Sequence, residues 1–236
     1  MPFSRVVAPV AVPDDRALTA NLVSIGMNFA ADAPRKPANI EDTLFFAAVR
    51  GMEHSDLRVL AVLVTWFGVH HPWVNADRLT RLVSAHESER VRALWAALAL
   101  WQRTDHRFAR MARAHLVPRV DLETDSRFLV RRHGEDPRFA KTPLRVAAIV
   151  LRDRPTDVLD PAELAARHPA YRWRVAMGPS YRADMWAAIE AQPTLTAAEL
   201  ARRCYGSFTT AWQVKRDFEL LRPRGPRAAL ARATVL

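Results

Sequence analysis

Three polar side chains, Thr209, Gln213 and Arg216, have the spacing and the chemistry of groups that contact nucleic-acid bases. At 100° per residue they fall on one face of a helix, opposite an apolar stripe. A glutamine amide can form two hydrogen bonds with adenine, and an arginine can do the same with guanine or can bind a phosphate. A threonine offers a hydroxyl to phosphate and a methyl group to thymine. This face is therefore a candidate surface for contacts with DNA.

Residues on either side of this face could hold the phosphate backbone. Ser207 stands where the helix would begin, so backbone N–H groups there would be free to bind a phosphate. Gly206 would make the sharp turn before it, and Arg202 and Arg203 in the preceding helix could straddle the backbone. The whole set of candidate DNA contacts is Arg202, Arg203, Ser207, Thr209, Thr210, Trp212, Gln213, Lys215, Arg216, Arg222, Arg224 and Arg227.

The last three of these arginines follow the helix, in the segment RPRGPRAALAR. They could form the tip of a β-wing or an arm that enters the minor groove, and a frayed basic tail fits the same residues. A second group, Arg107, Arg110 and Arg113, is spaced by three residues on another basic helix and would offer further contacts to phosphate. An ordinary solvated surface is the alternative interpretation both of this group and of the face around Gln213.

Helices are the elements that have to position these side chains. The chain has 236 residues, half of them hydrophobic and a quarter charged, with only 7 glycines. This balance is typical of a soluble and mostly α-helical protein. Side chains that can accept a hydrogen bond stand where helices should begin, so the expected N-caps include Ser55, Asn75, Asp160 and Thr196.

The positions of prolines and apolar runs predict four regions. Residues 1–40 form an N-terminal arm, residues 41–116 a first helical unit, residues 117–142 a partly irregular linker, and residues 143–236 a second helical unit with a basic tail. Within the linker, RFLVRR at 127–132 fits either a short strand, as in a β-hairpin, or a helix. The expected fold class is mostly α, with a short β-hairpin as an open alternative in the linker.

The segments 75–101 and 196–221 repeat one pattern. Each begins with a capped short helix, breaks, and continues in a longer helix with an apolar stripe at helical spacing. An apolar helix precedes each segment, which makes two tri-helical units, 57–101 and 181–221. These units resemble the core of the helix-turn-helix and winged-helix DNA-binding superfamily. The resemblance implies that the third helix of a unit lies in the major groove.

The long helix of the first unit has a different outer face. Opposite its apolar stripe lie Glu89, Ala93, Ala96 and Leu100. Small side chains of this kind suit close packing against another helix more than contact with base edges. We therefore expect the first unit to be a scaffold, and the Ala93/Ala96/Leu100 face to bind a second copy of the chain or another protein.

Charge and cysteine content restrict the partner and the compartment. The formal net charge of +10 favours a polyanionic partner, such as DNA, RNA or an acidic protein surface. Only three lysines contribute, and a composition rich in arginine, alanine and proline is also typical of a GC-rich genome. The single cysteine, Cys204, excludes an internal disulfide. No signal peptide or membrane-span pattern occurs, so a cytoplasmic protein is expected.

No set of residues in the sequence points to catalysis. Asp184 has no second carboxylate two residues later for two-metal phosphoryl transfer, and His70 and His71 lack a third metal ligand. We therefore expect a DNA-binding protein that regulates transcription, with no cofactor, metal or enzymatic activity. The alternative is a protein-interaction module, such as an antitoxin or adaptor that binds an acidic partner protein.

Overall fold

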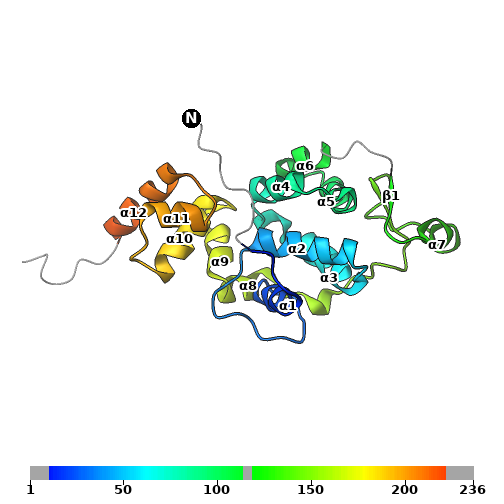
Figure 1. Cartoon of the computed structure of the whole chain (residues 1–236), viewed down its shortest axis with the longest axis horizontal. Coiled ribbons are helices and arrows are strands. Elements are labelled where there is room, and N and C mark those ends of the chain that lie inside the picture. The colour runs from blue at the N-terminus through cyan, green and yellow to red at the C-terminus, as the bar shows by residue number, and fades with distance from the viewer. Residues whose placement is uncertain (1–10, 114–118, 222–236) are drawn as a thin grey trace, which may run out of the picture. The chain divides into compact units, whose positions relative to one another are not determined.

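The computed structural model describes residues 11–113 and 119–221, which are mostly α-helical (Figure 1). They form two compact units, with the boundary between Pro179 and Ser180. The larger unit contains α1 (Asp15–Ser24), α2 (Ile40–Glu53), α3 (Leu57–His70), α4 (Ala76–Ala85), α5 (Glu89–Trp101), α6 (Ala109–Arg113), α7 (Ser126–His133), α8 (Pro161–Arg167), α9 (Pro169–Met177), the strands β1 (Val120–Asp121) and β2 (Leu144–Arg145), and the 3-10 turns η1 (His71–Trp73), η2 (His106–Phe108) and η3 (Pro155–Asp157). The smaller unit contains α10 (Tyr181–Ala191), α11 (Ala197–Arg203) and α12 (Phe208–Leu221).

Side-chain caps fix where several of these helices begin. Asn75 accepts a hydrogen bond from the third residue of α4, and Asp160 and Thr196 each close a capping box at the start of α8 and α11. These three caps confirm the sequence-based expectation. The fourth expected cap is wrong: Asp56 caps α3, and Ser55 before it has a left-handed backbone with φ of 56°.

Helix α5 lies in the core of the larger unit. It packs against α2, α4 and α6, and residues on every side of it are buried. Ala93 is 0% exposed, Ala96 is 1% exposed and Leu100 is half-buried. The prediction that this face of α5 binds a partner is therefore wrong. The chain's own helices cover Ala93 and Ala96.

The N-terminal region contributes to the same core. Helix α1 buries Leu18 and Leu22 against the rest of the larger unit, and Ile25 and Met27 follow as buried residues. The indole N–H of Trp66 in α3 donates a hydrogen bond of 2.7 Å to the carbonyl oxygen of Ile25. The prolines predicted a loose arm over residues 1–40, but the described part of this region is an integral layer of the fold.

The region expected to be a linker is folded. The segment RFLVRR lies in helix α7 and not in a strand, and the two short strands of the described chain, β1 and β2, pair in parallel with Val120 opposite Leu144. A parallel pair cannot be a hairpin, so that alternative is wrong. Leu144, Leu151 and Leu164 then join the hydrophobic core of the larger unit. The boundary between the units consequently falls near residue 179 and not near residue 143.

A close approach between α2 and α3 depends on Gly51. A Cβ atom at this position would lie 2.3 Å from Cγ of Leu60, a side chain that is completely buried. We expect Gly51→Ala to lower the free energy of unfolding by about 1–3 kcal/mol, because overpacking outweighs the better helix propensity of alanine. Chemical denaturation measures the loss. In a Leu60→Ala background the same substitution should cost much less, and an equal cost in both backgrounds would contradict this explanation.

One further property concerns membranes. Within residues 11–113 and 119–221, no helix has both the length and the hydrophobicity needed to cross a bilayer.

Candidate nucleic-acid interface

Helix α12 has one buried side in the smaller unit. It packs against α10 and α11, and Ala211 and Val214 face the interior with Met185, Ile189 and Leu200 from those helices. The apolar positions of α12 recur at helical spacing, so burying one stripe turns the opposite face outward. This packing positions the candidate DNA contacts.

Four residues connect α11 to α12, and their backbone explains the glycine in the turn. Gly206 was expected to make the sharp turn, but the left-handed residue of this segment is Tyr205, with φ of 55°. A Cβ atom at Gly206 would lie 2.3 Å from Cε of Met185 and 3.2 Å from Cβ of Tyr181. Glycine is therefore needed here because α10 approaches the turn closely, while Tyr205 supplies the change of direction.

The outward face of α12 contains three of the predicted contacts. Thr209 and Gln213 are exposed, and neither forms a side-chain hydrogen bond within the part of the chain that the structure describes. Trp212 lies beside them and is 52% exposed. The sequence from Phe208 to Arg216 contains no acidic residue. These groups are exposed to a ligand, and the nearest acidic residue in the sequence is Asp217.

Two cations of α12 already have partners. The ammonium of Lys215 donates to the carbonyl oxygen of Leu195 at 2.9 Å. Arg216 donates through Nε and Nη2 to one oxygen of Asp217, at 3.2 and 2.9 Å, and its guanidinium lies 5.5 Å from the centre of the Trp212 ring. Hydrogen bonds from Arg182 and Arg216 lower the pKa of Asp217. The carboxylate thus stays ionised and offsets part of the Arg216 charge.

The remaining predicted contacts of this unit differ in how far their side chains are already hydrogen-bonded within the protein. The Ser207 hydroxyl oxygen accepts from the backbone N–H of Thr210 at 3.1 Å and shares a hydrogen bond with the Thr210 hydroxyl. Ser207 thus caps α12 itself. Arg202 and Arg203 are both exposed, and Arg203 is held by the neutral side chain of Gln192. Hydrogen bonds from Thr196, and then the charges of Arg203 and Arg202, lower the pKa of Glu199, so this carboxylate stays ionised and offsets part of the charge of both arginines.

The small unit is electrically balanced over its described residues. Five basic and five acidic residues lie between positions 180 and 221. Additional positive charge follows in the sequence at Arg222, Arg224 and Arg227, which lie outside the described residues together with the expected wing or tail. Arg202 and Arg203 are consequently the principal phosphate contacts that the described small unit offers.

The second group of arginines is in the larger unit. Arg107 donates to the Asp105 carboxylate and to the carbonyl oxygens of His71 and Val74, so it connects η2 to η1 and is largely committed to the fold. Arg110 lines a groove of about 310 Å³ at the start of α4. Arg113 is exposed, and its Nε bonds to its own helix. The regular spacing of the three arginines suggested equivalent contacts to phosphate. In the structure Arg107 is held by the fold, whereas Arg110 and Arg113 are more accessible.

Sequence reasoning missed the apolar part of the α12 surface. Phe208 is 58% exposed at the start of the helix, and Leu220 and Leu221 are 68% and 73% exposed at its end. Phe208 follows Ser207 directly and precedes Trp212 by one helical turn, so two aromatic rings lie near one another on the same side. Trp212 was among the predicted contacts, but Phe208, Leu220 and Leu221 were not.

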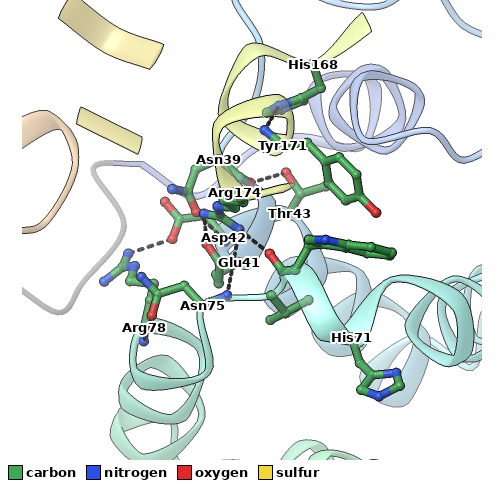
Figure 2. A network of polar contacts seen from close by, with 12 residues as sticks. Asn39, Glu41, Asp42, Thr43, His71, Asn75, Arg78, His168, Tyr171 and Arg174 are labelled. Carbon is green, nitrogen blue, oxygen red and sulfur yellow. Dashed lines mark hydrogen bonds and ion pairs between the residues drawn. The ribbon is translucent and has the colours of Figure 1, made fainter. Parts of the chain in front are cut away.

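A buried ion-pair network is the second feature that the sequence did not reveal (Figure 2). Both carboxylate oxygens of Glu41 in α2 accept hydrogen bonds from Arg174 in α9, at 2.6 and 2.8 Å, and the two side chains are 0% and 1% exposed. The backbone N–H of Asn75 donates to Glu41, and Arg174 also donates to the carbonyl oxygen of Trp73. The pair therefore joins α2, η1, α4 and α9.

Two buried histidines surround Tyr171 in the same unit. Nε2 of His70 lies 3.0 Å from the carbonyl oxygen of Leu159, and Nε2 of His168 lies 3.0 Å from that of Ala38. A carbonyl only accepts, so each histidine must carry its proton on Nε2. Their Nδ1 atoms then accept, from the Tyr171 hydroxyl at 2.7 Å and from its backbone N–H at 3.2 Å. The backbone N–H of Tyr171 fixes His168 in the neutral form, and His70 is neutral because burial lowers its pKa.

Burial sets the ionisation of these groups. It lowers the pKa of His70 and of His168 to about 4, and it raises the pKa of Tyr171. Since these side chains are enclosed by the fold, they hold helices together and are out of reach of a substrate.

The exposed polar groups of the smaller unit include those on α12 and Arg202 and Arg203 of α11, whereas the larger unit encloses His70, His168 and Tyr171. The arrangement on α12 can donate and accept hydrogen bonds and can contact an apolar group. No protein-family model, no curated protein and no solved structure matches this chain.

Proposed function

We propose that this chain binds double-stranded DNA through α12 and acts as a regulator of transcription. The observation that carries the proposal is the outward face of α12, where Thr209, Trp212 and Gln213 are exposed on a helix whose other side is buried. Side chains of these types, on a helix of this length, can reach base edges in the major groove.

The order of elements in the smaller unit supports this proposal. A short capped helix, α11, is followed by a four-residue turn and the longer helix α12, while α10 packs against α12 from behind. This order resembles a helix-turn-helix unit, in which the second helix of the motif enters the major groove. The two exposed arginines of α11 suit contacts to phosphates beside the groove. Helix α5, its counterpart in the sequence repeat, is buried and is not part of the proposal.

Binding of the full chain to duplex DNA tests the proposal. Preferred duplexes are first selected from a random-sequence library, and the dissociation constant is then measured by fluorescence anisotropy over a range of salt concentrations. We expect Gln213→Ala to weaken binding to the selected duplex about 5- to 100-fold and to leave the salt dependence unchanged, because it removes base contacts but no charge. Arg202→Ala and Arg203→Ala should each reduce the salt slope by about one.

Thr194→Ala is the matched control for Thr209→Ala. Both threonines are exposed, but Thr194 lies in the loop between α10 and α11. We expect Thr209→Ala to weaken binding and Thr194→Ala to leave it unchanged. If no duplex is enriched, or if the Gln213→Ala protein binds the selected duplex as tightly as the native chain, the proposal is wrong.

A protein-interaction module, such as an antitoxin or adaptor, is the second candidate. The observation that favours it is the pair Leu220 and Leu221, which is exposed at the end of α12, about 18 Å along the helix axis from Phe208. In that case the partner that co-purifies from the native source should be lost with Leu220→Asp and retained with Gln213→Ala. In a test of binding to duplex DNA, Gln213→Ala should weaken binding more than Leu220→Asp does.

A further inference from the structure

The part of α12 nearest its N-terminus carries four exposed side chains of two kinds, and the Arg216 guanidinium lies over one of them, the Trp212 ring. Thr209 and Gln213 are hydrogen-bonding groups, and Phe208 and Trp212 are aromatic rings that are 58% and 52% exposed. A helix in the major groove contacts bases mainly through residues of this part. The chemistry of these four side chains therefore sets the base pairs that α12 can distinguish, if the chain binds DNA as proposed.

The groups that would recognise guanine are engaged elsewhere. Guanine presents two acceptors in the major groove, which arginine or lysine satisfies. Here two guanidinium nitrogens of Arg216 donate to Asp217, and the ammonium of Lys215 donates to the carbonyl oxygen of Leu195. A contact of Arg216 with guanine would compete with Asp217, and a contact of Lys215 would draw its ammonium away from Leu195, so both cations are less available than Gln213.

The groups that remain match an A·T base pair. A glutamine amide complements the donor and acceptor of adenine, and the C5 methyl of thymine is the apolar group on the major-groove edge of the four bases. Phe208 and Trp212 are apolar surfaces exposed beside Gln213. Without such a methyl group in the complex, both rings would face the polar edges of bases and lose solvent contact for little gain.

We infer that α12 recognises consecutive A·T pairs, with Phe208 and Trp212 against thymine methyl groups and Gln213 on adenine. This inference rests on the proposed function and specifies its ligand. The two aromatic residues are four positions apart, so they are separated by about 6 Å along the helix axis. Successive bases are about 3.4 Å apart. A separation of about 6 Å is enough for the two rings to reach different base pairs.

Removal of the thymine methyl groups tests the inference. The full chain is titrated into three duplexes of equal length, one composed of A·T pairs in mixed order, one with every thymine replaced by uracil, and one composed of G·C pairs. All three have the same number of phosphates. We expect the native chain to bind the thymine duplex about three to five times more tightly for each contacted methyl group than the uracil duplex. The G·C duplex should bind more weakly than the thymine duplex.

Variants of Phe208 show whether this residue detects the methyl group. Because Phe208 is largely exposed, Phe208→Ala should fold, and circular dichroism checks this. In Phe208→Ala the difference between the thymine and uracil duplexes should shrink, and Phe208→Leu should restore part of it. Arg202→Ala should weaken binding to both duplexes equally.

The possible failures are distinguishable. Equal affinity of the native chain for the thymine and uracil duplexes overturns the inference and leaves the proposed binding to DNA intact. If Phe208→Ala keeps the full preference for the thymine duplex over the uracil duplex, another residue recognises the methyl group. That result also overturns the inference. Absence of binding to any duplex overturns both this inference and the proposed function.

Discussion

Replacement of Arg174 by methionine is expected to lower the free energy of unfolding of the larger unit by about 3–5 kcal/mol. The substitution leaves the Glu41 carboxylate buried at 0% exposure without its bidentate partner, and Arg174 is itself 1% exposed. An unpaired charge in such an environment costs much more than the pair contributes when it is intact. The carbonyl oxygen of Trp73 also loses a donor.

Chemical denaturation measures this effect, with two companion variants. Arg127→Ala is the control, because it removes an ion pair with Asp121 in which Arg127 is 72% exposed, and it should change the stability far less. The double variant Glu41→Leu/Arg174→Met should be more stable than Arg174→Met alone, since no unpaired charge remains. A loss in Arg174→Met no larger than that in Arg127→Ala would show that the buried pair is not important for stability.

Acid is expected to destabilise the larger unit between about pH 6.5 and pH 4. The pKa of His70 and of His168 falls from 6.5 to about 4 on folding, because burial disfavours the charged ring. As the pH drops below 6.5, the unfolded chain takes up protons first and is stabilised relative to the folded chain. Each histidine therefore removes up to about 3 kcal/mol of stability, and the loss levels off below about pH 4.

Single histidine variants isolate this contribution from the carboxylates that titrate nearby. His168→Asn keeps an acceptor for the backbone N–H of Tyr171, and His70→Gln keeps a donor for the carbonyl oxygen of Leu159. Each variant should unfold at a denaturant concentration that depends less on pH than that of the native chain. Curves of stability against pH that run parallel for native and variant proteins would show that these rings do not cause the acid sensitivity.

Local sequence signals were reliable where a helix end depends on adjacent residues. Asn75, Asp160 and Thr196 cap helices as expected, since an N-cap bond closes within three residues and needs no distant partner. Cys204 and Val83 occupy equivalent positions in the two repeated segments, and both are buried. Such assignments depend only on helical period and on short-range hydrogen bonds.

The candidate site could be predicted only in part. Helical period alone identified the outward positions of Thr209, Trp212 and Gln213. It could not show that Arg216 is held by Asp217, since adjacent residues on a helix do not usually face each other. Nor could it show that the ammonium of Lys215 bonds to a carbonyl group twenty residues away.

The two repeated segments show most clearly which features can be predicted from the sequence and which cannot. By itself it determined that 75–101 and 196–221 would each form a short capped helix and a longer helix with one apolar stripe, because caps and helical period are local properties. Only the tertiary structure decided whether the outer face of the second helix in each segment is buried or exposed. Helix α5 is covered by α2, α4 and α6, whereas within the described part of the smaller unit α12 packs on one side against α10 and α11. The pairing of Glu41 with Arg174 across 133 residues was decided in the same way, because burial and long-range contacts arise from all the elements packing together.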